Sequence, residues 1–413
     1  MPNQKPLHFP KRQSGVAGIL LGLLLIIGVA GFLVTTLRPG SNKEKLERER
    51  ATSLAMANAK DELIGFAVAN PARGFLPCPA DPALAGTPTE GTAMDTCNSD
   101  VLRVGRLPWR TLGLGDLRDG YGEPLWYAVS GNFTNDAVVI NRAASAPTLA
   151  VNGIVNATAI IFSAGGAAGA QQRGPAVAPC TTTASDIRQD YCAANYLDTD
   201  AVTGISNADA DTTFVQARGE TFNDALLAIT ADQFFEGVEK RVLQQVRACL
   251  RTYAAGNSNG LYPWAHADAS VIYLSAVPHV DATNALMGRI PSKIANSVVG
   301  LGWSLDCPLP SSGGAKSWLR DWHELLFYAV DDQYAPNGAG GGVGGLLTVN
   351  GTPNVRAVVI LTGAALPPQT RTTPAQQYVS SNYLDGNNVS GTVFGNTPPS
   401  GAPYNDRVLI VAP

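Results

Sequence analysis

The sequence predicts an α+β protein in which an N-terminal transmembrane helix extends into a head of two tandem domains. Each domain is predicted to be a helix followed by an antiparallel sheet. Three observations lead to this fold class: one long uncharged apolar run, a series of motifs that occurs twice, and turn-rich stretches between short β-type segments. The 413 residues exceed what one ordinary domain needs and suffice for two domains with an anchor.

The apolar run covers residues 16–37, which read VAGILLGLLLIIGVAGFLVTTL and contain no charge. A helix of this length can cross the roughly 30 Å hydrocarbon core of a bilayer. A short polar leader, residues 1–15, precedes it and carries basic side chains. The run is too long for a cleaved secretory signal and lacks the small residues of such a cleavage site. We therefore expect one membrane span with the large head outside the cytoplasm.

Two amphipathic helices are predicted, one at the start of each domain. The first covers residues 44–70, and its charged first half is expected to be solvated while its apolar second half packs on a sheet. The second covers residues 231–256 and has no membrane half. The apolar positions of the first helix that recur on one face are Leu54, Ala55, Ala59, Leu63, Phe66 and Ala67.

The head is predicted to contain the same domain twice, over residues 38–230 and 231–413. Eight motifs recur in the same order in both halves, which indicates a copied structural unit. Each unit reads as one helix and four or five short strands rich in β-branched and aromatic residues. Repeated pairs include Gly105-Arg106-Leu107-Pro108 with Gly288-Arg289-Ile290-Pro291, Asn195-Tyr196-Leu197-Asp198 with Asn382-Tyr383-Leu384-Asp385, and residues 223–230 with 405–413.

The composition is typical of a loop-rich exported protein. Charged residues make up 15% of the chain, against roughly 25% in an ordinary soluble domain. The net charge of −4 offers no basic face, so nucleic acid is not an expected partner. Six cysteines suit an oxidising compartment, and their proximity favours three disulfides, although buried free thiols are an alternative. The favoured pairs are Cys78 with Cys97, Cys180 with Cys192, and Cys249 with Cys307.

No set of catalytic residues is predicted, so we do not expect an enzyme. Apart from His8 in the leader, the histidines His266, His279 and His323 lack the spacing of a metal motif. Ser258 lies in a Gly-x-Ser-x-Gly string, but this string follows a helix instead of a strand, the reverse of a nucleophile elbow.

One weak candidate for a metal site remains. Asn207, Asp209 and Asp211 have the alternating spacing of oxygen ligands for a hard cation. The glycine and glutamate of an EF-hand loop are missing at the required positions. A calcium site of another kind is therefore a possible use of these residues, a solvated acidic turn is the alternative, and no other cofactor is expected.

The junction of leader and apolar run resembles the type III leader of type IV prepilins and pseudopilins. Lys11-Arg12-Gln13-Ser14-Gly15 is followed directly by Val16 and the apolar run. The resemblance implies that a prepilin peptidase cuts after Gly15 and that the new amine of Val16 is methylated. Glycine suits this position because an extended backbone without a side chain can enter the peptidase freely.

The chain departs from this family at the fifth mature position, where Leu20 replaces the usual glutamate. Its absence resembles the K-type minor pseudopilins and some minor pilins, which occupy the filament tip. A second resemblance lies in the Gly74–Pro79 element and in residues 105–130, which look like stretches in the heads of bacterial prepilin-type proteins. These resemblances imply a pilin-like form for both domains of the head.

The resemblance implies a minor pilin or pseudopilin at the tip or initiation complex of a type IV pilus or a type II secretion pseudopilus. It also implies a single-pass protein of the bacterial inner membrane, with the head in the periplasm or at the cell surface. Its expected partners are other pilins, the prepilin peptidase and the membrane itself. The alternative is an uncleaved single-pass inner-membrane protein whose head binds a ligand or scaffolds a complex.

Overall fold

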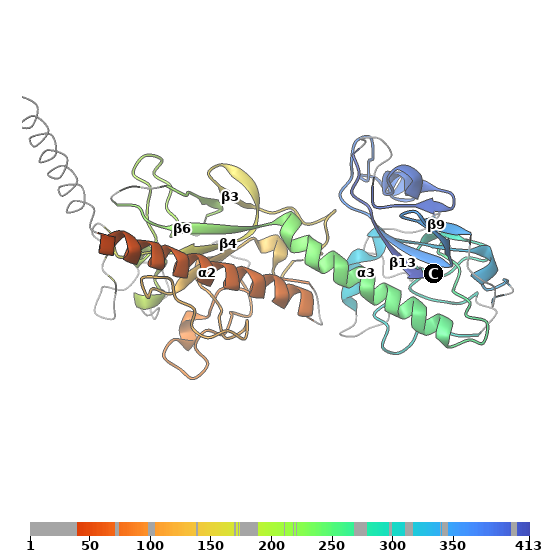
Figure 1. The fold of residues 1–413 in the computed structure, drawn as a ribbon, viewed down its shortest axis with the longest axis horizontal. Helices are drawn as coiled ribbons and strands as arrows, with labels where there is room; N and C mark the ends of the chain where they lie inside the picture. The colour runs from red at the N-terminus through yellow and green to blue at the C-terminus, as the bar shows by residue number, and fades with distance from the viewer. Residues whose placement is uncertain are drawn as a thin grey trace, which may run out of the picture.

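The computed structural model shows two lobes that follow one another along the chain (Figure 1). The first lobe runs from helix α2 (Pro39–Ala69) to strand β6 (Ala225–Thr230), and helix α3 (Ala231–Ala255) opens the second lobe. The structure describes residues 39–70, 74–97, 104–137, 139–168, 171, 173, 189–209, 211–217, 219, 221–267, 279–296, 300–309, 317–338, 340, 346–397 and 403–413.

In the first lobe, α2 packs against a six-stranded sheet. The ten-residue strand β4 is the centre of this sheet, because β2, β3 and β6 all pair with it antiparallel. Strand β1 extends the sheet beyond β2, and β5 pairs with β3 in the parallel sense. The strands other than β6 are β1 (Val104–Arg106), β2 (Leu125–Val129), β3 (Leu149–Val151), β4 (Ile154–Ser163) and β5 (Thr213–Phe214).

The second lobe repeats this order of elements with one change. The counterpart of β4 is interrupted at Arg356, whose N–H donates to the carbonyl of Ala412. The sheet is thereby divided into a four-stranded sheet, β13-β11-β8-β7, and a three-stranded sheet, β10-β9-β12. Its strands are β7 (Met287–Arg289), β8 (Leu326–Val330), β9 (Leu347–Val349), β10 (Thr352–Val355), β11 (Ala357–Leu361), β12 (Val393–Phe394) and β13 (Arg407–Ala412).

Short helical turns occur at matching places in the two lobes, as after β2 and after β8. One is α-helical, α4 (Pro374–Gln377). The 3₁₀ turns are Pro82–Leu84, Gly131–Phe133, Gln189–Tyr191, Ala193–Asn195, Ser317–Leu325, Asp332–Tyr334, Ser380–Asn382 and Gly386–Val389.

The repeat extends to strand register and to single hydrogen bonds. Gly105 lies opposite Tyr127, and the Tyr127 hydroxyl donates to a proline carbonyl at 3.1 Å. In the second lobe Gly288 lies opposite Tyr328, whose hydroxyl also donates to a proline carbonyl at 3.1 Å. Glycine is required at Gly288 because a Cβ there would lie 2.1 Å from the carbonyl oxygen of His266.

Helix α2 has two different halves. Residues 42–51 are exposed, and their charges form i,i+4 pairs such as Arg48 with Glu44 at 2.5 Å. In the second half the small and apolar side chains of Ala55, Ala59, Leu63 and Ala67 are buried against the sheet. Leu54, expected on the same face, is instead 59% exposed, and Phe66 is only partly buried.

The core is continuous between the lobes. One cluster of buried side chains includes residues of α2, β2, β4, α3, β8, β11 and β13. A second cluster covers the opposite face of the first sheet, where Trp126 and Phe162 pack with Phe214 and Tyr196. Strand β2 is therefore buried on both faces, which explains why its sequence LWYAV lacks polar residues.

The predicted fold class is wrong on two counts. No helix in the described part of the chain is both long enough and apolar enough to cross a bilayer. Helix α2 starts at Pro39 with a charged stretch, and charges are costly in hydrocarbon, whereas residues 16–37 lie outside the described residues. The predicted single-pass inner-membrane location is contradicted by the same finding. The sheets are also not purely antiparallel, because β3–β5 and β9–β12 pair in parallel.

Candidate functional site

The predicted processing site, Gly15 and Val16, lies outside the described residues. Two of the predicted disulfides are confirmed, Cys78 with Cys97 and Cys249 with Cys307. Cys192 is also disulfide-bonded, while Cys180 lies outside the described residues. None of the described cysteines is a free thiol, so the alternative of buried free thiols fails for them.

The weak calcium candidate is not assembled by the fold. Asp209 and Asp211 are exposed, and Asp211 accepts a hydrogen bond from the backbone of Thr213. Asn207 is fully buried, and its amide faces the core instead of the two aspartates. Among the described residues, no group of three histidine, cysteine or acidic side chains is arranged to hold a metal ion.

Three histidines that are scattered in the sequence form a buried row in the second lobe. The ring of His279 lies 5.1 Å from that of His266 and 5.2 Å from that of His323. Burial, followed by the charges of His323, His266 and Arg289, lowers the pKa of His279 to about 2, so this ring stays neutral. The His266 and His279 rings stack within 19° of parallel, so their ring-plane nitrogens do not converge on a common ion.

A buried polar network in the first lobe fastens a loop to the last strand. Asp224, just before β6, accepts hydrogen bonds at Oδ2 from the Asp198 N–H and from Asn207 Nδ2, both at 2.9 Å. Asp198 in turn accepts from the Asn223 N–H at 2.7 Å and from Gln171 Nε2 at 2.6 Å. The two aspartates therefore tie together three chain segments.

The second lobe contains the same network with the same atoms. Asp406, just before β13, accepts at Oδ2 from the Asp385 N–H at 2.7 Å and from Asn388 Nδ2 at 3.0 Å. Asp385 accepts from the Asn405 N–H at 2.8 Å and from Gln369 Nε2 at 2.9 Å. Two copies of one buried network indicate that its geometry is needed by the fold unit itself.

Each network also contains an arginine. The hydrogen bonds that the structure shows for this arginine go to other groups and not to the two aspartates. Arg173 donates to the carbonyl of Gly165 at 2.6 Å and lies over the Tyr196 ring. Arg371 donates to the carbonyl of Gly363 at 2.9 Å and lies over the Tyr383 ring. These arginines hold the exit of the central strand against the loop, which is a structural role.

Aromatic rings join the two lobes at the start of α3. Phe235 of α3 lies 5.6 Å from Phe133 of the first lobe and 6.0 Å from Trp322 of the second. Beside them, the carbonyl of Asp321 accepts a hydrogen bond from Asn141 at 2.5 Å. The junction is therefore packed like a domain interior, which favours one rigid body over two mobile lobes.

Glu239 of α3 is the ionic centre of this junction. Its side chain is 2% exposed and pairs with Arg142 at 2.6 Å and with Arg407 at 2.7 Å. Arg142 belongs to the first lobe and Arg407 to the second. Burial alone would lower the pKa of Arg142, but hydrogen bonds and charges from Glu239 and Asp232 outweigh it and raise this pKa.

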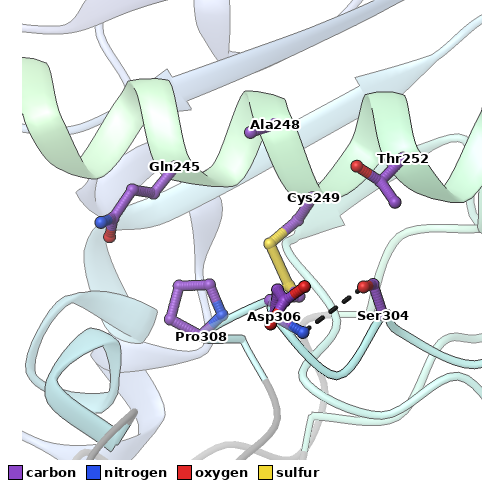
Figure 2. Close-up of a pocket in the computed structure, with 8 residues that line it drawn as sticks. Gln245, Ala248, Cys249, Thr252, Ser304, Asp306 and Pro308 are labelled. Atoms are coloured by element: carbon purple, nitrogen blue, oxygen red, sulfur yellow. Dashed lines mark hydrogen bonds between the residues drawn. A yellow bond between two sulfur atoms is a disulfide. The ribbon is translucent and has the colours of Figure 1, made fainter.

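A small pocket lies beside a disulfide, between α3 and the loop that carries Cys307 (Figure 2). It measures about 160 Å³, less than the roughly 300 Å³ of the smallest usual ligand sites. Figure 2 shows Gln245 and Thr252 on the helix side and Pro308 on the loop side. The Cys249–Cys307 bridge therefore acts as a staple that holds this loop on α3.

Replacing Cys249 and Cys307 together by serine is expected to lower the free energy of unfolding by about 2–4 kcal/mol. The bridge closes 58 residues, against 19 for Cys78–Cys97, and a longer loop gains more from closure. Urea unfolding of both double-serine variants measures the difference. A larger loss for the Cys78–Cys97 variant would contradict this ranking.

The geometry describes a duplicated scaffold in which a network of buried side chains recurs in both lobes, with hydrogen bonds among these side chains and to the backbone. Ser258 belongs to the Gly-x-Ser-x-Gly string that is not expected to form a nucleophile elbow. It lies in the turn after α3, where its hydroxyl contacts Asn259. No family model, curated protein or solved structure matches the chain.

Proposed function

We propose that the protein is a structural subunit of a filament, a minor pilin or pseudopilin that occupies the tip or the initiation complex. Its head would act by shape and rigidity instead of by catalysis. The observation that carries the proposal is the combination of a solvated, charged start of α2 with a head whose two lobes share one core. A filament subunit needs both a free helical segment for neighbours and a head that transmits force without bending.

The position of the second lobe favours a tip location. Helix α3 continues away from the first lobe, so the second lobe lies at the end of the head that is far from Pro39 (Figure 1). In a filament body, the space beyond a head is occupied by the next subunit. A head extended in this direction fits best where no subunit follows. Leu20, in place of the glutamate usual in the resembling families, supports the same location.

The proposal predicts that the mature chain begins at methylated Val16 in cells with an active prepilin peptidase. Mass spectrometry of the N-terminal peptide measures this directly. Gly15→Arg should abolish processing and filament function, because a large side chain would obstruct the extended backbone at the cut.

Gly18→Ala is the matched control, since it changes a nearby glycine outside the cut and should leave processing intact. A chain that keeps Met1 beside an active peptidase would contradict the proposal. In that case the alternative holds, a head that binds a ligand or scaffolds a complex without being cut.

A further inference from the structure

Each copy of the aspartate network contains one carboxylate oxygen that has no hydrogen-bond partner. Asp224 and Asp406 are both 3% exposed, and Oδ2 of each accepts two hydrogen bonds. Oδ1 of each is buried and accepts no hydrogen bond. The same orphan atom at the same place in both lobes is a feature of the repeated unit and not an accident of one loop.

A buried carboxylate with a bare oxygen is costly to keep ionised, because the charge has left water without full compensation. The partner aspartates do not share this problem, since Asp198 and Asp385 each receive donors on both oxygens. The charges of Arg173 and Arg371 act on the pairs, but the hydrogen bonds of these arginines go to carbonyls and glutamines. A proton on the orphan oxygen removes the charge and leaves both accepted hydrogen bonds at Oδ2 in place.

We infer that each lobe contains a proton-operated latch, in which protonation of Asp224 or Asp406 fastens the loop at Asp198 or Asp385 to the last strand. In the protonated form only one carboxyl of each pair, that of Asp198 or Asp385, carries a charge. In the ionised form two buried like charges repel, and the loop is released from the strand. The latch makes the stability of the head depend on the pH around it.

The electrostatics of both sites agree. Burial raises the pKa of Asp224 to about 7 and that of Asp406 to about 7, and the charges of Asp198 and Asp385 add to the increase. Hydrogen bonds to Oδ2 and the charges of Arg173 and Arg371 oppose it without cancelling it. A folded pKa above the unfolded value of about 3.9 gives stability that is complete below that value and is lost as pH rises through about 7.

Tyr404, which lies beside Asp406, does not titrate in this window, and His279, which belongs to the separate histidine row of the second lobe, acts in the opposite direction. Burial, with the charge of Asp406 next, raises the pKa of Tyr404, so its hydroxyl stays neutral. His279 of the second lobe has a lowered pKa, so its contribution is lost as pH falls below about 6.5. The test must therefore compare variants at the same pH and not rely on the wild-type profile alone.

The experiment measures urea unfolding of the full-length chain between about pH 5 and pH 8.5, for wild type and for Asp224→Asn/Asp406→Asn. Asparagine keeps an oxygen for the two accepted hydrogen bonds and cannot be ionised. Between about pH 7 and pH 4, each latch should change the folding equilibrium constant by up to about tenfold per pH unit. The double variant should lose this slope and be relatively more stable at high pH. Asp209→Asn/Asp332→Asn, one exposed aspartate in each lobe, should keep the wild-type slope.

Equal pH slopes for wild type and Asp224→Asn/Asp406→Asn would overturn the inference. If that variant does not fold, infrared spectroscopy of the wild type decides. A protonated-carboxyl band near pH 6 that disappears near pH 9 supports the latch, and its absence at both pH values refutes it.

Discussion

Phe235→Ala is expected to lower the free energy of unfolding by about 3–5 kcal/mol and to uncouple the two lobes. Phe235 is 1% exposed and contacts Phe133 from the first lobe, Phe234 from its own helix and Trp322 from the second lobe. Its removal leaves a cavity in the middle of the shared core. Because both lobes form the walls of this cavity, neither can collapse to fill it without separating from the other.

Differential scanning calorimetry tests this expectation, since one core should give one cooperative transition in the wild type. Phe162→Ala is the matched control. Phe162 is equally buried but belongs to the separate cluster on the far face of the first sheet. It should destabilise the protein but leave a single unfolding transition, as in the wild type. Two transitions in the wild type, or the same profile for both variants, would contradict the shared core.

The long helices were predictable because their signals are local. The expected helix 231–256 lies at Ala231–Ala255, and its start is marked by a capping box of Thr230 and Gln233. The error at Leu54 has a physical cause. Leu54 lies in the packed part of α2, but the buried stripe follows Thr52, Ala55, Met56 and Ala59, so Leu54 points away from it. The two-residue strands β5 and β12 carry no detectable pattern, and with them the parallel pairings were missed.

The candidate site was visible in the sequence only as fragments. The repeats around Asp198 and Asp385, and the Asn-Asp pairs at 223–224 and 405–406, were recognised as recurring motifs. Their hydrogen bonds join residues more than 20 positions apart, which one sequence cannot reveal. The useful signal was recurrence of the same polar residue types at corresponding places, since a surface loop has no reason to keep them in both copies.

Residues of the junction had no such signal. Arg142 and Glu239 lie outside the motifs that recur in both halves, and 97 positions separate them. A charged residue on a predicted amphipathic helix is normally assigned to the solvated face, as Glu236 is. Glu239 lies on the buried face instead because two arginines meet it there. The contacts between the two repeats are therefore not part of the repeated unit, and the repeated motifs could not predict them.

Glu239→Gln is therefore expected to lower the free energy of unfolding by about 3–5 kcal/mol, although the side chain keeps its shape. The change leaves Arg142, 17% exposed, as a largely buried cation without its main partner. Arg407 is 38% exposed and can turn to water, so most of the loss comes from Arg142. Because the pair is buried, added salt should not reduce the difference between wild type and variant.

Glu236→Gln is the matched control, three residues earlier on the exposed face of the same helix, where Glu236 pairs with Lys240. It should leave the unfolding midpoint almost unchanged, because exposed pairs contribute little. Arg142→Met combined with Glu239→Leu should recover part of the lost stability, since apolar side chains can replace a buried ion pair without leaving an unpaired charge. Equal unfolding midpoints for the Glu239→Gln and Glu236→Gln variants would show that the ionic centre does not hold the lobes together. The shared apolar core, with the aromatic contacts around Phe235, would then account for the coupling of the lobes.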